Sequence, residues 1–252
     1  MLRETFPPEF DISYSVKANP NPAILRFFLA KGSGLEIASG GELYLALAAG
    51  CSPEKILFAG PGKTETELEF ALSGGIGEIH AESGLEVERI SAISRKLGIL
   101  GRVAIRVNPS QEAQGGAMRM GGKPAPFGID EEQIDAVIER IIADPYLEFR
   151  GIHLFTGTQI LDAAVLIRQY RKGIEIAVRV AGRFKRPMRT VDFGGGLGIP
   201  YFANEKELDM VSLRNELGTV MDKVRKEPLL SGTQFVLEPG RYLVGEAGVY
   251  VA

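Results

Sequence analysis

The sequence predicts an α/β protein in which eight strand–helix units close into a (β/α)8 barrel. Three observations support this: eight short apolar runs bounded by glycine, proline or asparagine, helical patterns between them, and a regular spacing. Eight units over 252 residues give about 31 residues each, near the length of one βαβ step. Alternating strands and helices predict a parallel sheet, and eight of them favour a closed TIM-like barrel over the alternative, an open doubly wound sheet.

The expected strands are rich in β-branched and aromatic residues and end at turn residues. They cover residues 10–19, 34–39, 55–60, 77–82, 101–108, 149–155, 189–196 and 233–240. In the first strand, Ile12, Tyr14 and Val16 indicate a run heading into a core, and Asn-Pro-Asn-Pro follows at once. We expect Lys17 to end this strand.

The expected helices have apolar residues at helical spacing, and several open with an acceptor side chain or proline and close on glycine. They cover residues 21–32, 40–50, 63–75, 83–98, 130–144 and 161–184. Strands and helices together indicate one barrel domain over residues 1–252.

The composition excludes several classes of protein. A hydrophobic content of 45% provides ample material for a core, and a net charge of −3 gives no basis for binding nucleic acid or an anionic membrane. Cys51 is the only cysteine, which excludes an internal disulfide and indicates a reducing compartment. No run approaches the roughly 20 apolar residues that span a bilayer, and the first ten residues lack a signal-peptide core. We expect a soluble, cytoplasmic protein without a metal site.

Residues suited to catalysis recur at the carboxyl ends of the expected strands, where barrel enzymes place their active sites. Lys17 ends the first strand, Glu36 lies in the second, Arg106 in the fifth and His153 in the sixth. Each alone also fits a structural role, such as a surface lysine, a paired arginine or a core histidine. Their recurrence in register favours one shared site.

The last two strands end in GGGLG (Gly194–Gly198) and EPGRY (Glu238–Tyr242). Glycine-rich loops let backbone N–H groups approach a phosphate, and barrels often bind phosphate after strands seven and eight. Arg241 can pair with a phosphate through two hydrogen bonds. These loops therefore predict a phosphate site.

Two nucleotide-binding motifs are incomplete. The GGGLG run is no dinucleotide fingerprint, because Ile199 stands where the last glycine is required. The GPGKT run at residues 60–64 is no P-loop, because Leu57 stands where the first glycine is required.

A phosphate site, a lysine, a histidine and a glutamate together meet the needs of pyridoxal 5′-phosphate. Its aldehyde forms a Schiff base with a lysine, and its ring nitrogen needs an acid partner so that the ring can accept electrons. A flat imidazole can cover one face of the ring.

Five ordered blocks then resemble the fold-type III pyridoxal-phosphate-dependent decarboxylases, the group of ornithine, arginine and diaminopimelate decarboxylases. The blocks are YSVKANPNP, LEIASGGEL, GIHLFTGTQ, DFGGGLGIPY and EPGRYLVGEAG. The resemblance covers nearly the whole chain and implies a pyridoxal-phosphate-binding barrel of the alanine racemase type.

The resemblance also implies residue roles. Lys17 would form the Schiff base, His153 would stack on the pyridine ring, and Glu238 would pair with the ring nitrogen; these are the expected catalytic residues. The other expected cofactor-binding residues are Glu36, Arg106, Thr156, Gly194, Gly195, Gly196, Gly240 and Arg241.

The implied function is amino-acid decarboxylation. The stretches SGGEL and GGGLGIPY resemble the diaminopimelate decarboxylase branch. The stretches GGAMRMGGKPAPFGID and GPGKTETEL resemble a subgroup in which some members act on an amino acid held on an acyl carrier protein. The expected substrate is therefore a free diamino acid or a carrier-bound amino acid.

Members of this family continue into a β-domain after the EPGRY block and form homodimers. We therefore expect this chain to be a barrel fragment of a longer, homodimeric protein. Two alternatives are a pyridoxal-phosphate-binding barrel with a regulatory or homeostasis role, and a racemase. Glu238 disfavours the racemase, because alanine racemases characteristically place an arginine at the ring nitrogen.

Overall fold

Eight parallel strands form a closed ring. The computed structural model describes residues 2–110, 118–119, 127–155 and 157–249. The ring runs β1–β2–β3–β4–β5–β8–β10–β11, with β11 paired back to β1, which confirms the (β/α)8 barrel. The strands are β1 (Phe10–Ser15), β2 (Gly34–Ile37), β3 (Ile56–Phe58), β4 (Glu78–Ala81), β5 (Gly101–Asn108), β8 (Leu147–Leu154), β10 (Thr190–Asp192) and β11 (Gln234–Leu237).

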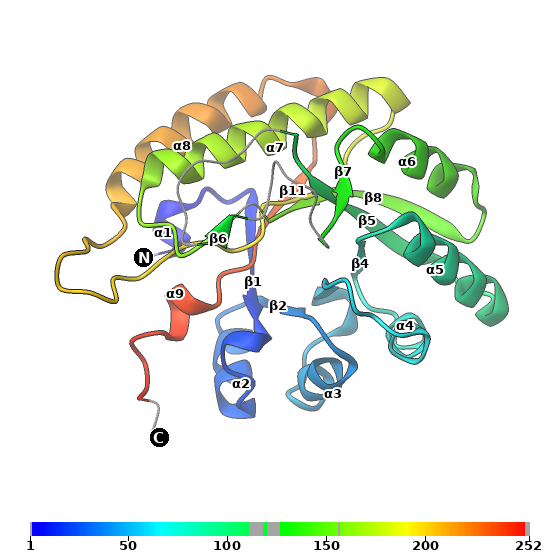
Figure 1. The fold of residues 1–252 in the computed structure, drawn as a ribbon, viewed down its shortest axis with the longest axis horizontal. Coiled ribbons are helices and arrows are strands. Elements are labelled where there is room, and N and C mark those ends of the chain that lie inside the picture. The colour runs from blue at the N-terminus through cyan, green and yellow to red at the C-terminus, as the bar shows by residue number, and fades with distance from the viewer. Residues whose placement is uncertain (1, 111–117, 120–126, 156, 250–252) are drawn as a thin grey trace.

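Helices surround this ring, with α7 and α8 on one side and α2, α3 and α4 on the opposite side (Figure 1). They are α2 (Pro22–Ala30), α3 (Gly40–Ala48), α4 (Glu65–Ser73), α5 (Gly84–Leu97), α6 (Ile134–Ala143), α7 (Ala163–Phe184) and α8 (Met210–Val224). Of these, α8 was not among the expected helices. The short elements are α1 (Leu2–Thr5), α9 (Arg241–Val244), β6 (Met118–Arg119), β7 (Ile129–Asp130) and β9 (Gly157–Thr158).

Local capping explains why the helices start close behind the strands. The hydroxyls of Ser39, Thr64 and Ser83 each accept a hydrogen bond from the backbone three residues ahead, which satisfies an otherwise unpaired N–H group. Thr64 and Glu67 form a complete capping box. Short connections of this kind hold the carboxyl ends of the strands on one side of the barrel.

The outer face of the strands is apolar and packs against the helices. In β1, Phe10, Ile12 and Tyr14 are buried, and the Tyr14 ring stacks on Phe28 of α2 with centroids 4.4 Å apart. Complete burial of one such side chain is worth about 1.5–3 kcal/mol. Burial of this outer layer therefore stabilises the packing of the helices on the strands.

The inner face of the ring is unusually polar for a barrel, where branched aliphatic side chains normally fill the interior. Strand β4 and strand β10 are not neighbours in the sheet, yet the hydroxyl of Thr190 donates to Glu78 Oε2 over 2.7 Å. His80 and Asp192, two positions further along these strands, are also buried. Polar contacts therefore cross the interior.

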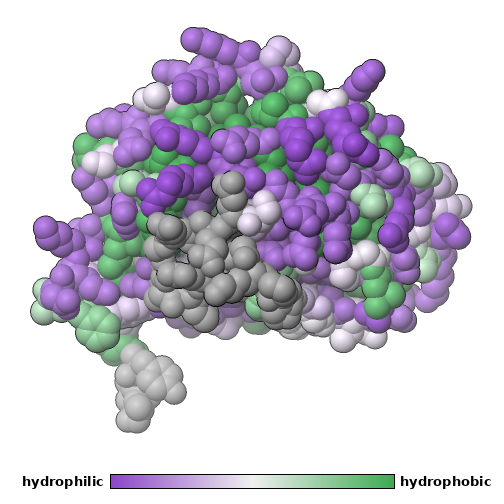
Figure 2. Space-filling view, turned by 45° about the horizontal axis from the view of Figure 1, so that its top comes forward, coloured by the Kyte–Doolittle hydropathy of each residue, from purple (hydrophilic) through white to green (hydrophobic). Residues whose placement is uncertain are grey.

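Hydrophilic residues dominate the face of the molecule shown in Figure 2, with hydrophobic residues interspersed. This is expected of helices that turn one apolar stripe toward the strands. Within the described ranges, none of the helices is both long and apolar enough to cross a membrane.

Candidate functional site

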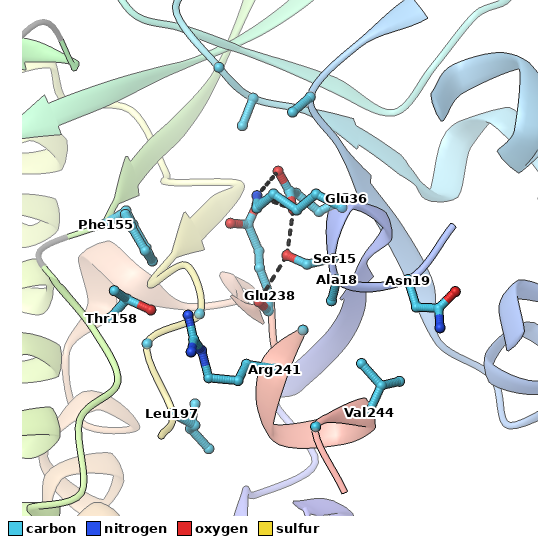
Figure 3. Close-up of a pocket in the computed structure, with 18 of the residues that line it drawn as sticks. Ser15, Ala18, Asn19, Glu36, Phe155, Thr158, Leu197, Glu238, Arg241 and Val244 are labelled. Carbon is cyan, nitrogen blue, oxygen red and sulfur yellow. Dashed lines mark hydrogen bonds and ion pairs between the residues drawn. The ribbon is translucent and has the colours of Figure 1, made fainter. Parts of the chain in front are cut away.

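A cavity of about 910 Å³ opens at the carboxyl ends of the strands (Figure 3). Nine of the predicted site residues line it: Lys17, Glu36, Arg106, His153, Gly195, Gly196, Glu238, Gly240 and Arg241. Gly194 is not among the lining residues, and Thr156 lies outside the described residues. The structure thus brings together side chains from strands far apart in the sequence.

Lys17 enters this cavity from a turn and not from the strand itself. Strand β1 ends at Ser15, and Lys17 lies in a 3-10 turn over Val16–Ala18. Pro20, just after this turn, has no N–H group with which the chain could resume a ladder. The Lys17 side chain is 56% exposed, and its Nζ donates to both oxygens of Glu36 over 2.8 Å.

Glu36 is buried and binds this amine. Its Oε2 also accepts a hydrogen bond of 2.5 Å from the Ser15 hydroxyl. Burial and the nearby charge of Glu238 raise the pKa of Glu36, against the opposing effect of Lys17. Burial alone would lower the pKa of Lys17, but the carboxylates of Glu36 and Glu238 outweigh it and raise that pKa. The amine is therefore held as an ammonium ion beside a ready proton acceptor.

Replacement of Glu36 by glutamine is expected to make Lys17 more reactive toward small aldehydes near neutral pH. The pKa of Lys17 falls when its nearest carboxylate is lost, and each unit increases the neutral amine about tenfold. Reductive methylation with formaldehyde, followed at Lys17 by mass spectrometry across pH, should shift to lower pH. The exposed Glu65→Gln variant is the control. An unchanged pH profile in Glu36→Gln would contradict this coupling.

Glu238 and His153 form the buried floor of the cavity. Glu238 directly follows β11, and its Oε2 lies 3.4 Å from His153 Nε2. Burial favours the neutral form of Glu238, but His153, His80 and Lys17 together hold the pKa of this carboxyl far below its usual range. Burial lowers the pKa of His153 to about 4, so its imidazole is neutral and presents a flat face.

Several atoms of this floor are unsatisfied. Among the described residues, Glu238 Oε1 and both ring nitrogens of His153 have no hydrogen-bond partner. Buried polar atoms rarely lack a hydrogen-bond partner, because each one without a partner destabilises the folded protein by about 1–3 kcal/mol. A buried carboxylate with a free oxygen at a cavity wall suits a ligand with a cationic N–H group.

The glycine loops bring the ends of β10 and β11 into close contact. A Cβ atom on Gly195 would lie 2.5 Å from the carbonyl oxygen of Glu238. Gly194 uses its N–H group to donate to Asp192 Oδ1 over 2.7 Å, and its carbonyl accepts from the Glu238 N–H group over 2.8 Å. Gly194 therefore supports Glu238, while Gly195 and Gly196 face the cavity.

Arg241 extends from α9 toward the side of the cavity that holds Thr158 and Leu197 (Figure 3). Its guanidinium donates to the Tyr201 hydroxyl and lies 5.4 Å from the centroid of that ring. The side chain remains exposed, so its cationic group is available to an anion in the cavity. Gly240, just before it, packs against Ser15: an added Cβ would lie 2.9 Å from the Ser15 Cβ.

Arg106 lies at the cavity wall, but part of its charge is already engaged. Its Nη1 donates to Glu82 Oε1 over 2.7 Å, and its guanidinium lies 5.0 Å from the Phe127 ring. Glu82 also accepts from the N–H groups of Gly60 and Gly128. Arg106 and Glu82 therefore link three cavity loops.

Sequence reasoning missed Ser15, His80, Glu82 and Asp192. In β4 and directly after it, Glu78, His80 and Glu82 stand at every second position, and that alternation is the signal that could have indicated a polar inner face. It also missed the role of the incomplete P-loop. There, Lys63 is buried, pairs with Glu86 over 2.8 Å and fixes the loop at the cavity rim.

The donor atoms of His80, His153 and Glu238 lie within 4.8 Å of one another. However, the two imidazoles stack with centroids 4.4 Å apart and planes inclined by 28°. An imidazole nitrogen binds a metal ion in the plane of its ring. Because these two planes are stacked and nearly parallel, one metal ion could not lie in both of them. The cluster suits an organic cation beside Glu238 better than a metal ion.

The residues present fit pyridoxal phosphate. Lys17 reaches into the cavity, Glu238 has a free buried oxygen for a ring nitrogen, and Arg241 offers a cation beside Gly195 and Gly196. The cavity is of the size that small-molecule cofactors use, roughly 300–1,000 Å³.

Comparisons with known proteins identify the family of the chain. Residues 1–245 match the family model for the pyridoxal-binding domain of pyridoxal-dependent decarboxylases. The chain is 38% identical to L-glutamyl-[BtrI acyl-carrier protein] decarboxylase of Niallia circulans, over 99% of this chain and 58% of that protein. It is 36% identical to diaminopimelate decarboxylase of Aquifex aeolicus, over 99% of this chain and 57% of that protein.

The fold is similar to that of solved relatives. The crystal structure of diaminopimelate decarboxylase from M. jannaschii with L-lysine aligns with a TM-score of 0.84 and 30% identity, covering 93% of this chain and 54% of that chain. The chain thus spans a little over half the length of these relatives. The family match over residues 1–245 and the barrel fold together show that the chain belongs to the pyridoxal-dependent decarboxylases and contains their pyridoxal-binding domain.

Proposed function

We propose that this chain is the cofactor-binding barrel of a pyridoxal-phosphate-dependent amino-acid decarboxylase. The observation that supports it most is the meeting of Lys17, Glu238 and Arg241 in one cavity at the carboxyl ends of the strands. When bound, pyridoxal phosphate supplies an aldehyde for the substrate amine and a ring that accepts electrons from the α-carbon. The following roles are proposals for this chain's own residues.

Lys17 would hold the cofactor through its amine, and Glu36, which binds that amine, would accept the proton of its ammonium group. Glu238 holds a proton at the ring nitrogen by remaining a carboxylate beside it. His153, whose Nε2 lies 3.4 Å from Glu238 Oε2, would cover one face of the ring with its neutral imidazole.

Arg241 and the backbone N–H groups near Gly195, Gly196 and Gly240 bind the phosphate. Arg106 fixes the cavity wall through Glu82, and Gly194 supports Glu238 from behind. Thr156 is a further phosphate ligand by resemblance alone.

The substrate is an amino acid, either a free diamino acid or one carried on an acyl carrier protein. Both classes appear among the relatives, and the identities of 38% and 36% do not separate them. We further propose a cytoplasmic, homodimeric protein when the chain is part of a longer one. The lone, buried Cys51 suits a reducing compartment.

A direct assay tests this function. The chain, alone and within its full-length gene product, is loaded with pyridoxal phosphate and given meso-diaminopimelate or carrier-bound L-glutamate. Carbon dioxide release is followed, with chiral chromatography of the remaining amino acid. We expect carbon dioxide release from one of these substrates by the longer protein. Racemisation without carbon dioxide would assign the site to a racemase, and cofactor binding without turnover would assign a regulatory role.

A further inference from the structure

His80 is the one histidine of the chain that the proposed function does not use. The sequence has two histidines, and His80 is fully buried in the barrel interior. Its ring stacks against His153 with centroids 4.4 Å apart. It therefore lies directly behind the floor of the cavity.

Both ring nitrogens of His80 face carboxylates. Its Nε2 lies 3.1 Å from Glu78 Oε1 and 3.9 Å from Asp192 Oδ2. Its Nδ1 lies 3.8 Å from Glu238 Oε1, and among the described residues neither of these two atoms has a hydrogen-bond partner. A neutral imidazole has one N–H group, whereas an imidazolium can donate on both sides.

The ionisable groups packed against His80 come from four elements of the barrel. The groups that face His80 are Glu78 on its own strand, His153 on β8, Asp192 on β10 and Glu238 after β11. Burial, and then the charge of Glu238, raise the pKa of Asp192 well above its usual range. Two cationic side chains lie further out, Arg150 near Glu78 and Arg106 near His153.

Glu78 connects His80 to the opposite end of the barrel. A second cavity of about 310 Å³ lies there, and Glu78, Arg150 and Thr190 are among its lining residues. Glu78 Oε2 accepts from the Thr190 hydroxyl over 2.7 Å and lies 3.7 Å from Arg150 Nε. A succession of ionisable groups thus runs from the lower cavity through Glu78 and His80 to Glu238.

We propose that His80 is a positioning residue whose imidazolium balances the charge of Glu238 in the free protein and gives up its proton when a cationic ring binds there. Two cations next to one buried carboxylate repel each other. Binding of the cationic ring must therefore weaken the binding of the second proton to His80, just as that proton weakens the binding of the ring. The released proton leaves toward Glu78 and the lower cavity, because a ligand fills the upper one. This inference rests on the proposed function only for the identity of the ring.

The test measures protons released on binding of pyridoxine 5′-phosphate, which has no aldehyde and cannot bond to Lys17. Titration calorimetry at pH 7 in buffers of different ionisation enthalpy gives the number of protons released for each ligand bound. Wild-type protein should release about one proton more than His80→Gln, since the contributions of the ligand itself are common to both. A purely structural role would leave the proton count unchanged. Equal counts in the two proteins would overturn the proposal.

Nitrogen NMR of the wild-type imidazoles provides a second measurement that needs no variant of His80. With only two histidines, a His153→Gln spectrum assigns both. The free protein should show His80 with both nitrogens protonated, and the ligand should reduce this to one. A His80 ring with one N–H in the free protein overturns the proposal. Failure of the ligand to bind would count against the proposed function, while the free-protein spectrum still decides the charge of His80.

Discussion

Replacement of Gly151 by alanine is expected to prevent stable closure of the barrel. A Cβ atom at this position would lie 1.8 Å from the carbonyl oxygen of Thr190 on the neighbouring strand. Gly151 pairs with Thr190 in β10, and on its other side it follows a register shift in the pairing with β5. The nearest atoms, the carbonyl oxygen and carbon of Thr190, belong to the backbone, so no side-chain rotation can relieve the contact.

The Gly151→Ala variant is expected to lose about 4 kcal/mol or more in its free energy of unfolding, which is exceptional for the addition of one methyl group. Domains of this kind have a total stability of only about 5–15 kcal/mol. Urea denaturation followed by circular dichroism should show a large loss in the free energy of unfolding. Gly218→Ala on α8 is the matched control, because nothing lies within 4 Å of its added Cβ. A Gly151→Ala protein as stable as Gly218→Ala would contradict the observed packing of β8 against β10.

Replacement of Glu238 by glutamine is expected to cause a comparably large loss, in cofactor binding and turnover. The variant keeps the shape of the side chain and removes the carboxylate that faces His153, His80 and Lys17. Removing one member of a buried charge pair costs about 3–5 kcal/mol. This free energy corresponds to a decrease in the binding constant or the rate constant on the order of a hundred- to several-thousand-fold.

The measurement is the dissociation constant of pyridoxine 5′-phosphate, followed by carbon dioxide release in the full-length protein. Glu246→Gln, an exposed carboxylate shortly after α9, is the control and should bind as wild type. Circular dichroism of both variants confirms that the fold is retained. Unchanged affinity in Glu238→Gln would show that this carboxylate does not meet the ring nitrogen.

The sequence predicted the barrel well because its signals are local. Each expected strand coincides with an observed barrel strand, and the six expected helices correspond to α2 to α7. Helix α8 was missed although Leu213, Leu217 and Val220 keep helical spacing. Gly218 weakens the helical propensity of that run by about 1 kcal/mol, and packing of the buried Leu213 and Leu217 compensates.

The candidate site was predictable to the extent that it depends on strand ends. Carboxyl ends of parallel strands meet on one side of a barrel, so the order of the strands alone places Lys17, Glu36 and Glu238 together. Contacts across the ring could not be predicted, because they depend on which strands face each other after closure. The contacts of His80 with Glu238, and of Thr190 with Glu78, are of this kind.

Borohydride trapping tests the proposed site most directly. The folded chain is mixed with pyridoxal phosphate, reduced and digested, and the modified peptide is identified by mass spectrometry, with Lys17→Ala as the control. We expect a single adduct on Lys17 and none at an equivalent level in the control. Adducts spread over surface lysines, with no preference for Lys17, would contradict the assignment of this cavity as the cofactor site.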